Sequence, residues 1–277
     1  MSIQTESGEK IENKKPLSPK ETLEPEPSYF ALQAMWGVTK HMGGLKATEE
    51  LVELCHIDKG KHVLEVGCGT GMTACYLAKR HGCRVVGIDI SEGMIDWSKR
   101  RAKRAGVEDK VEFRVADART LPFEDTLFDA VICESVTAFV DKQRAISKYV
   151  RVTKPGGYIG LNEATWIKAA PPEVVEYFSH AMGKVEFLTS DGWKASLEGS
   201  GLTDIVVRIY KVNALSQWMN EMRQIDSLDY FRAWSKFVSV YIKSSVVRKY
   251  VRELWPPPKS IFKIFEYFGY GIYVGRR

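Results

Sequence analysis

A glycine-rich turn follows an apolar run in the first third of the sequence. Residues 62–66 are largely apolar, and residues 67–71 then read Gly-Cys-Gly-Thr-Gly. Glycine has no side chain, so a ligand can approach the backbone closely, and the free N–H groups at the start of a following helix point toward it. A dinucleotide fingerprint would have glycine where Met72 stands, and the lysine of a phosphate-binding P-loop is missing. The turn predicts a ligand bound at the start of a helix.

Acidic residues stand at the ends of three further apolar runs. Asp89 lies 20 positions after Gly69, Asp117 follows the next run, and Glu134 closes the one after it. The carboxyl ends of parallel strands meet at one edge of a sheet, where a carboxylate can accept hydrogen bonds from ribose hydroxyls or from an adenine amino group. Taken singly, each acid also fits a helix cap, a solvated loop or a structural strand end.

The elements that position these residues alternate between short β-rich runs and helical spacing. The expected strands cover residues 62–66, 84–88, 111–115, 128–134, 157–162 and 204–210. The expected helices cover residues 71–80, 92–105, 141–151 and 189–199. Because parallel neighbours need a crossover, this alternation predicts a parallel sheet with helices on both faces. A further helical stretch over 214–267, broken by three prolines, precedes a last strand at 268–275.

In order and spacing, residues 36–211 resemble the class I S-adenosylmethionine-dependent methyltransferases, particularly their small-molecule branch. The resemblance rests on the strand and turn at 62–71 together with Asp89 and Asp117. It implies an α/β fold of the Rossmann-like type, with a seven-stranded sheet whose last strand is antiparallel. It also implies S-adenosylmethionine as cofactor, S-adenosylhomocysteine as product, and in-line methyl transfer to a small molecule or lipid head group.

The resemblance also assigns residues to parts of the cofactor. The methionine part would be surrounded by Glu65, Gly67, Gly69 and Gly71, the ribose by Asp89, and the adenine by Asp117 and Ala118. The predicted cofactor-binding set is completed by Cys68, Ile90, Met94 and Glu134. The two candidate catalytic residues are Glu134, expected beside the sulfonium and the acceptor, and His41, a proton acceptor in a segment that resembles the family's N-terminal cover.

The composition divides the chain into a tail and a domain. Residues 1–28 are rich in Glu, Lys, Pro and Ser, so they cannot bury enough surface to offset their ordering entropy and are expected to be disordered. Residues 29–277 are expected to form the methyltransferase domain, with an N-terminal cover at 29–58. A helical insertion at about 213–267 would form the acceptor pocket or its lid.

The insertion is strongly basic. Residues 230–263 hold eight Lys or Arg and one acid, Glu253. One interpretation is a lid helix with a solvated basic face, and the other is a peripheral contact with an anionic membrane. The helical spacing of Trp234, Phe237 and Tyr241 favours the lid, because these rings would cover the sheet and the pocket.

Composition also excludes several classes of protein. The 277 residues carry a net charge of +5, which is low for a DNA-binding module, and no base-methylating N/D-P-P-Y/F motif stands at 134–137, so nucleic acid is an improbable partner. Five cysteines without a C-x-x-C pair and five scattered histidines predict neither disulfides nor a metal site. No signal peptide or bilayer-length apolar run is visible, so a cytoplasmic protein is expected.

Two rival functions remain at this point. A nucleotide-binding oxidoreductase would share the strand-turn-helix arrangement, although Met72 weighs against it. A non-catalytic partner protein could retain the fold, although the intact glycine turn and Asp89 weigh against that. The sequence leaves open the acceptor and its attacking atom, the number of methyl groups transferred, the need for a general base and the oligomeric state.

Overall fold

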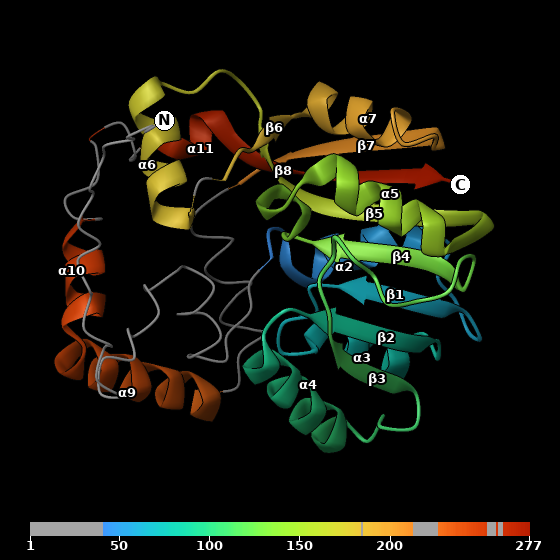
Figure 1. Cartoon of the computed structure of the whole chain (residues 1–277), viewed down its shortest axis with the longest axis horizontal. Coiled ribbons are helices and arrows are strands. Elements are labelled where there is room, and N and C mark those ends of the chain that lie inside the picture. The colour runs from blue at the N-terminus through green and yellow to red at the C-terminus, as the bar shows by residue number, and fades with distance from the viewer. Residues whose placement is uncertain (1–40, 184, 213–226, 254–258, 260–262) are drawn as a thin grey trace, which may run out of the picture.

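The computed structural model describes residues 41–183, 185–212, 227–253, 259 and 263–277 (Figure 1). The expected tail at 1–28, the first part of the expected cover and the start of the expected insertion lie outside these residues. The described strands are β1 (His62–Val66), β2 (Arg84–Asp89), β3 (Val111–Val115), β4 (Phe128–Glu134), β5 (Thr153–Trp166), β6 (Leu188–Thr189), β7 (Thr203–Lys211) and β8 (Phe268–Arg276). The helices before β7 are α2 (Gly44–Leu54), α3 (Met72–Arg80), α4 (Glu92–Ala105), the short 3₁₀ helix η1 (Thr137–Phe139), α5 (Lys142–Val152), α6 (Pro172–Met182) and α7 (Ser190–Glu198).

The strands form one mixed sheet in the order β3-β2-β1-β4-β5-β8-β7, with β6 pairing beside β5. Strands β1 to β5 are parallel, and β8 inserts antiparallel between β5 and β7. The seven-stranded α/β sheet with an antiparallel last strand is therefore confirmed, with the two-residue β6 as an addition. The carboxyl ends of β1, β2 and β4 lie next to one another in this order, which is where the sequence places its glycine turn and its acids.

Side chains of the central strands alternate between two cores. In β4, Val131 and Cys133 face a core that includes Tyr149 of α5 and Trp193 of α7, whereas Ile132 faces the core on the other side. That second core is formed with α2, α3 and α4, so helices cover both faces of the sheet (Figure 1). The central strands must be apolar on both faces because neither face meets water.

Helices α9 (Ser227–Lys243), α10 (Ser245–Glu253) and α11 (Ile264–Tyr267) precede β8. The helical insertion was expected to break at the prolines 256–258, and the structure has a further break at Ser244. The Ser244 hydroxyl accepts a hydrogen bond from the Val247 N–H at 3.2 Å, which caps a new helix there. Helices α9 and α10 lie on the side toward which the parallel strands point (Figure 1).

Three elements differ from the sequence-based expectation. Strand β5 is longer than the predicted 157–162, because it pairs with β4 along one edge and with β8 along the other. Helix α6 was not predicted, although Val174, Phe178 and Met182 recur at helical spacing; Val174 is its one fully buried residue, and the other two pack partly buried against the core. Strand β6 is too short to leave a pattern. Within the described ranges, every helix is too short or too polar to cross a membrane.

Candidate functional site

The glycine turn joins β1 to α3 in a conformation that favours glycine. Gly67, Gly69 and Gly71 have φ values of 72°, 52° and 71°, in the left-handed region where a side chain is disfavoured. The N–H of Cys68 donates to the Ile88 carbonyl at 2.8 Å, which ties the turn to the end of β2. The turn is therefore fixed against the neighbouring strand.

Asp89, the last residue of β2, holds the glycine turn and the start of α4 together. Its Oδ2 accepts from the Gly69 N–H at 3.0 Å, and its Oδ1 accepts from the Ser91 N–H at 2.9 Å. Burial raises the pKa of the Asp89 carboxyl, while these N–H groups lower it. The carboxylate keeps further lone pairs for a ligand, because each oxygen can accept more than one hydrogen bond.

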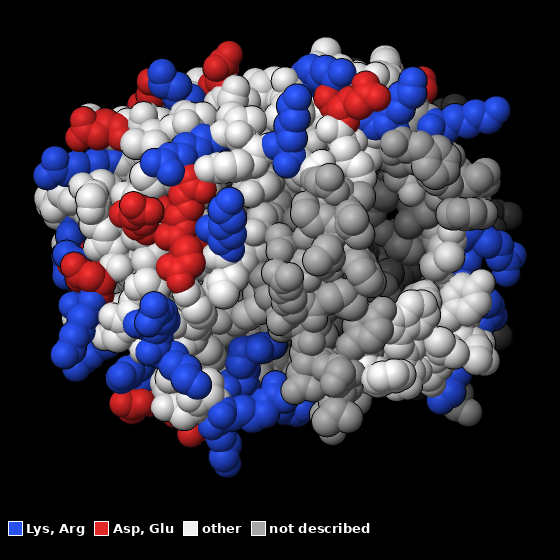
Figure 2. Space-filling model, turned by 180° about the vertical axis from the view of Figure 1, so that it is seen from behind, with Lys and Arg blue, Asp and Glu red and all other residues white. Residues whose placement is uncertain are grey.

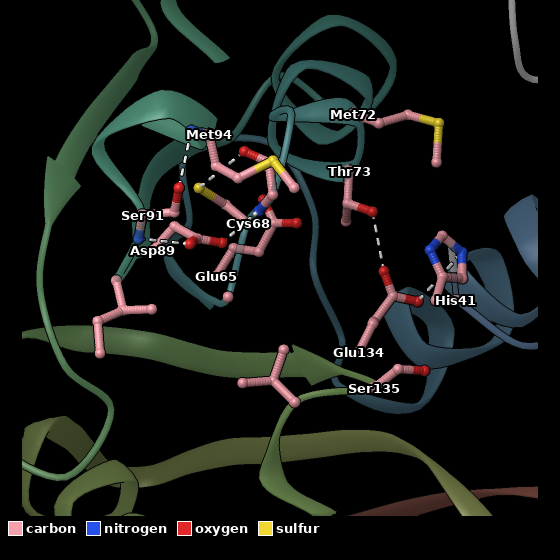
Figure 3. Close-up of a pocket in the computed structure, with 14 residues that line it drawn as sticks. His41, Glu65, Cys68, Met72, Thr73, Asp89, Ser91, Met94, Glu134 and Ser135 are labelled. Carbon is pink, nitrogen blue, oxygen red and sulfur yellow. Dashed lines mark hydrogen bonds and ion pairs between the residues drawn. The ribbon is translucent and has the colours of Figure 1, made fainter. Parts of the chain in front are cut away.

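A cavity lies at the carboxyl ends of β1, β2 and β4 (Figure 3). Of the predicted site residues, those that line it are His41, Glu65, Gly67, Cys68, Gly69, Asp89, Ile90, Met94 and Glu134. Figure 3 shows Asp89, Ser91 and Met94 at one end and His41, Thr73 and Glu134 at the other. Gly71 lines neither this cavity nor the adjoining second cavity described below. A Cβ on Gly71 would come 2.8 Å from a ring carbon of Phe113 and 2.9 Å from the Cβ of Ser98, so this glycine permits close packing.

A second cavity adjoins the first and shares Gly67, Asp89, Ile90 and Val136 with it. The predicted adenine residues Asp117 and Ala118 line it. The Asp117 carboxylate accepts from the Arg119 guanidinium at 2.6 Å, and this hydrogen bonding lowers the pKa of Asp117. Asp117 therefore already has a cationic partner in this structure.

Helices α2 and α3, strand β5 and the segment before α2 bring polar groups to the Glu134 carboxylate. Its oxygens accept from the hydroxyls of Thr48 at 2.9 Å and Thr73 at 2.8 Å and from the amide of Asn162 at 3.4 Å. The His41 Nε2 lies 3.7 Å from Glu134 Oε1 and 3.1 Å from the Thr48 hydroxyl. The side chains of His41 and Glu134 are both buried, so the structure brings the two candidate catalytic residues together at one end of the cavity.

Two buried polar atoms of the first cavity have no hydrogen-bond partner among the described residues. They are Oε2 of Glu65 and Oγ of Ser135. Burial raises the pKa of the Glu65 carboxyl well above its usual value, and the nearby carboxylate of Glu134 adds to this effect. An unpartnered buried polar group is costly, so both atoms favour a polar ligand, and a cationic group beside Glu65 would stabilise its charge.

The structure adds lining residues that the sequence analysis did not select. In the first cavity these are Met72, Thr73, Ser91, Ser135 and Val136, and the second adds Arg119, Phe139 and Val140 among others. Most of them directly follow a strand end or the glycine turn, and that position is the signal that could have found them. Ser135 also has a φ of 61°, which is uncommon for a residue with a side chain.

Glu163, a buried residue of β5, holds the loop that lines both cavities. Its carboxylate accepts from the N–H groups of Val136 at 3.2 Å, Thr137 at 2.7 Å and Ala138 at 3.3 Å. Burial raises the pKa of the Glu163 carboxyl to about 7, although these hydrogen bonds lower it. The sequence analysis did not select this acid, although it directly follows the expected strand 157–162; in the structure β5 continues past it to Trp166.

The raised pKa of Glu163 predicts a pH-dependent stability. Between about pH 4.5 and about pH 7 the native carboxyl binds a proton that the unfolded chain has released, so the free energy of unfolding falls as the pH rises through this window. The expected fall is on the order of 3 kcal/mol. Urea unfolding at a series of pH values should show it in the wild type and in the exposed control Glu108→Gln. Glu163→Gln should make the fall smaller by about this amount, while the raised pKa values of Glu65 and Asp89 still contribute a fall of the same sign. An unchanged slope in that variant would contradict the assignment.

Comparisons with known proteins agree with this geometry. The family model described as a methyltransferase domain matches residues 64–161. The 27-O-demethylrifamycin SV methyltransferase of Amycolatopsis mediterranei is 30% identical over 189 residues, which are 62% of this chain and 69% of that protein. The chain belongs to the class I S-adenosylmethionine-dependent methyltransferases. The oxidoreductase alternative is thereby dropped, and the cofactor is S-adenosylmethionine.

Other relatives of this methyltransferase differ in length and acceptor. Phosphoethanolamine N-methyltransferase 1 of Arabidopsis thaliana is 30% identical over 204 residues, which are 73% of this chain and 40% of that protein. Three of the curated relatives are matched over 40%, 59% and 66% of their own length. A methyltransferase from Thiobacillus denitrificans, solved with S-adenosylhomocysteine, has the same fold, with a TM-score of 0.67 and 22% identity over 91% of this chain and 99% of that one.

The residues of the methyltransferase fit its cofactor on structural grounds. The glycine turn leaves the backbone open along one wall of the cavity, and the unpartnered Glu65 oxygen provides an acceptor for an ammonium group. The Asp89 carboxylate lies where the two cavities join, within reach of groups bound in either.

Proposed function

We propose that this protein transfers a methyl group from S-adenosylmethionine to a small-molecule acceptor. The observation that carries the proposal is the first cavity, which has a glycine turn and Asp89 at one end and the Glu134 cluster at the other. When bound, the cofactor supplies a methyl group on a positive sulfonium, which is a good leaving group. The chain then has to align the acceptor and exclude water.

We propose that the predicted residues hold the cofactor in three parts. Glu65 and the glycine turn bind the methionine part, Asp89 accepts from the ribose hydroxyls, and the second cavity with Asp117 and Ala118 receives the adenine. Arg119 already occupies the Asp117 carboxylate in this structure, so adenine binding there requires the two groups to share it.

His41 and Glu134 have distinct roles in the proposal. His41 accepts the proton of an acceptor that has one to lose, and Glu134, 3.7 Å away, orients its ring and stabilises its protonated form. The hydroxyls of Thr48 and Thr73 hold the Glu134 carboxylate in place. This arrangement suits hydroxyl and amine acceptors. The protonated His41 ring would stay paired with the Glu134 carboxylate.

Relatives support a small molecule or a lipid head group as the acceptor class. These relatives are named for a rifamycin and for phosphoethanolamine, an oxygen and a nitrogen acceptor respectively. A transfer screen with donor labelled in its methyl group, across amines, phenols, thiols, quinones and lipid head groups, tests the activity. Donor binding without transfer to any acceptor or to a metabolite extract would favour the non-catalytic partner instead. The cytoplasmic location remains a prediction.

Replacing Asp89 with alanine should weaken donor binding without unfolding the chain. The variant loses an acceptor for two hydroxyls and also the hydrogen bonds to the Gly69 and Ser91 N–H groups. The expected loss is about 1.5 to 3 kcal/mol, the range for hydrogen bonds to a charged group. Calorimetric titration with S-adenosylhomocysteine measures it. Unchanged affinity in a folded variant would show that Asp89 does not bind the ribose. The control Glu108→Ala should bind as the wild type does.

A further inference from the structure

Helix α9 presents an apolar stripe to solvent. Phe231, Trp234, Val238 and Ile242 are 73%, 50%, 44% and 67% exposed. They are spaced three or four residues apart, so they share one face of the helix. Large side chains in a row are unusual on a surface that meets only water, and such a patch marks an interaction site. This corrects the sequence-based expectation that Trp234 would be needed to cover the sheet.

Residues on an adjacent face of α9 are less exposed than the stripe. Phe237 and Tyr241 are half-buried and their rings lie 6.0 Å apart. Helix α10 follows at once, and its Val247 is buried. The Tyr250 hydroxyl donates to the Ala181 carbonyl at 2.5 Å, and this bond joins α10 to α6.

Exposed cations lie beside the stripe. Lys243 ends α9, and Lys249 and Arg252 are exposed on α10. Glu253 is the one acid of α10, and it lies 3.8 Å from Lys249, so it offsets only part of this charge. Figure 2 shows Lys and Arg beside uncharged groups at the lower right, where α9 and α10 lie.

We infer that α9 and α10 form a surface that binds anionic membranes. An exposed apolar stripe flanked by cations matches a helix lying in the lipid interface, where Phe, Trp and Ile enter the acyl boundary while Lys and Arg meet anionic head groups. A soluble protein partner would have to supply both an apolar groove and acidic groups, whereas an anionic bilayer supplies both. The surface lies on the side to which the parallel strands point (Figure 1). The inference does not depend on methyl transfer.

Vesicle binding by the full chain tests the inference. The probes are vesicles of phosphatidylcholine with phosphatidylglycerol and vesicles of phosphatidylcholine alone, in buffer of ~0.15 M salt. The wild type should sediment with the anionic vesicles, and far less with the neutral ones. Because each basic residue at the surface adds attraction, Lys243→Gln, Lys249→Gln and Arg252→Gln together should weaken binding roughly a hundredfold. Higher salt should weaken the wild type in the same direction.

Two sets of control substitutions distinguish binding through this surface from nonspecific effects of charge and of exposed apolar side chains. The control triple Lys79→Gln, Lys99→Gln and Lys103→Gln removes the same charge from exposed positions of α3 and α4 and should bind as the wild type does.

The second set tests the apolar stripe. It compares the double variant Phe231→Ser and Ile242→Ser with the double control Val115→Ser and Val206→Ser, which changes exposed valines elsewhere. The first pair should weaken vesicle binding about tenfold or more, and the second should not. All substituted side chains are exposed, so far-ultraviolet circular dichroism should show folded protein throughout. Wild-type protein that stays in the supernatant, or equal losses in test and control variants, would overturn the inference. So would self-association that the Phe231 and Ile242 changes abolish in the absence of vesicles.

Discussion

Replacing Gly67 with alanine is expected to abolish measurable binding of the methyl donor. Gly67 has a φ of 72°, so an alanine there is strained by its own backbone. A Cβ would also overlap Cγ2 of Val136 and come within 3.0 Å of its Cβ and Cγ1. Both Gly67 and Val136 line the two cavities, so relief of the collision must displace a wall of the site. A loss of more than ~4 kcal/mol, about a thousandfold, is expected.

Calorimetry with S-adenosylhomocysteine measures this loss, and two further variants locate its cause. Gly60→Ala places alanine at a φ of 89° with nothing within 4 Å, so it has the strain without the collision and should keep donor affinity. Adding Val136→Ala to Gly67→Ala removes the two overlapping methyl groups and should restore part of the affinity. Tight binding by the single variant would show that the turn can move away from Val136 without loss.

Replacing His41 with glutamine is expected to lower kcat by about a hundredfold to ten-thousandfold on an acceptor that loses a proton. Glutamine keeps a polar side chain near Glu134 but cannot take up the proton. Donor affinity should stay within about twofold, because His41 lies at the acceptor end of the cavity and Asp89 at the other.

The readouts for His41 distinguish a proton acceptor from a merely structural residue. The rate of the wild type should rise with pH through a limb that the His41→Gln variant lacks. His81→Gln is the matched control, because His81 lies at the end of α3 remote from the cavity. An unchanged kcat for the His41 variant would mean that alignment alone drives the transfer.

The parts of the site that the sequence could predict are local in the chain. The glycine turn directly follows β1 and Asp89 ends β2, so their positions come from strand prediction and from the rule for parallel strand ends. The partners of Glu134 could not be found in this way. Thr48 and Asn162 lie 86 and 28 residues away in the sequence, and an ordinary threonine or asparagine gives no signal of its distant contact.

The difference between local and distant contacts also explains which parts of the fold could be predicted. The strands β1 to β4 were predicted to within a residue. Strands β1, β2 and β4 are short apolar runs that are mostly buried, whereas the edge strand β3 alternates, with Phe113 as its one buried residue. The cations Lys249 and Arg252 were visible as a basic segment. The exposure of Trp234 was not, because helical spacing alone does not say which face of α9 meets the protein.

The position of β8 has a consequence for biosynthesis. Phe268 to Arg276 pair with β5 on one side and β7 on the other, and Trp166 is paired with Phe268, about a hundred residues later in the chain. At roughly 5 to 20 residues per second, a ribosome needs several seconds or more to make the intervening segment. Throughout that time the edge of β5 lacks its neighbour, and an open edge invites pairing with other nascent chains. The edge of β5 is therefore closed only when β8 has been made and has paired with it.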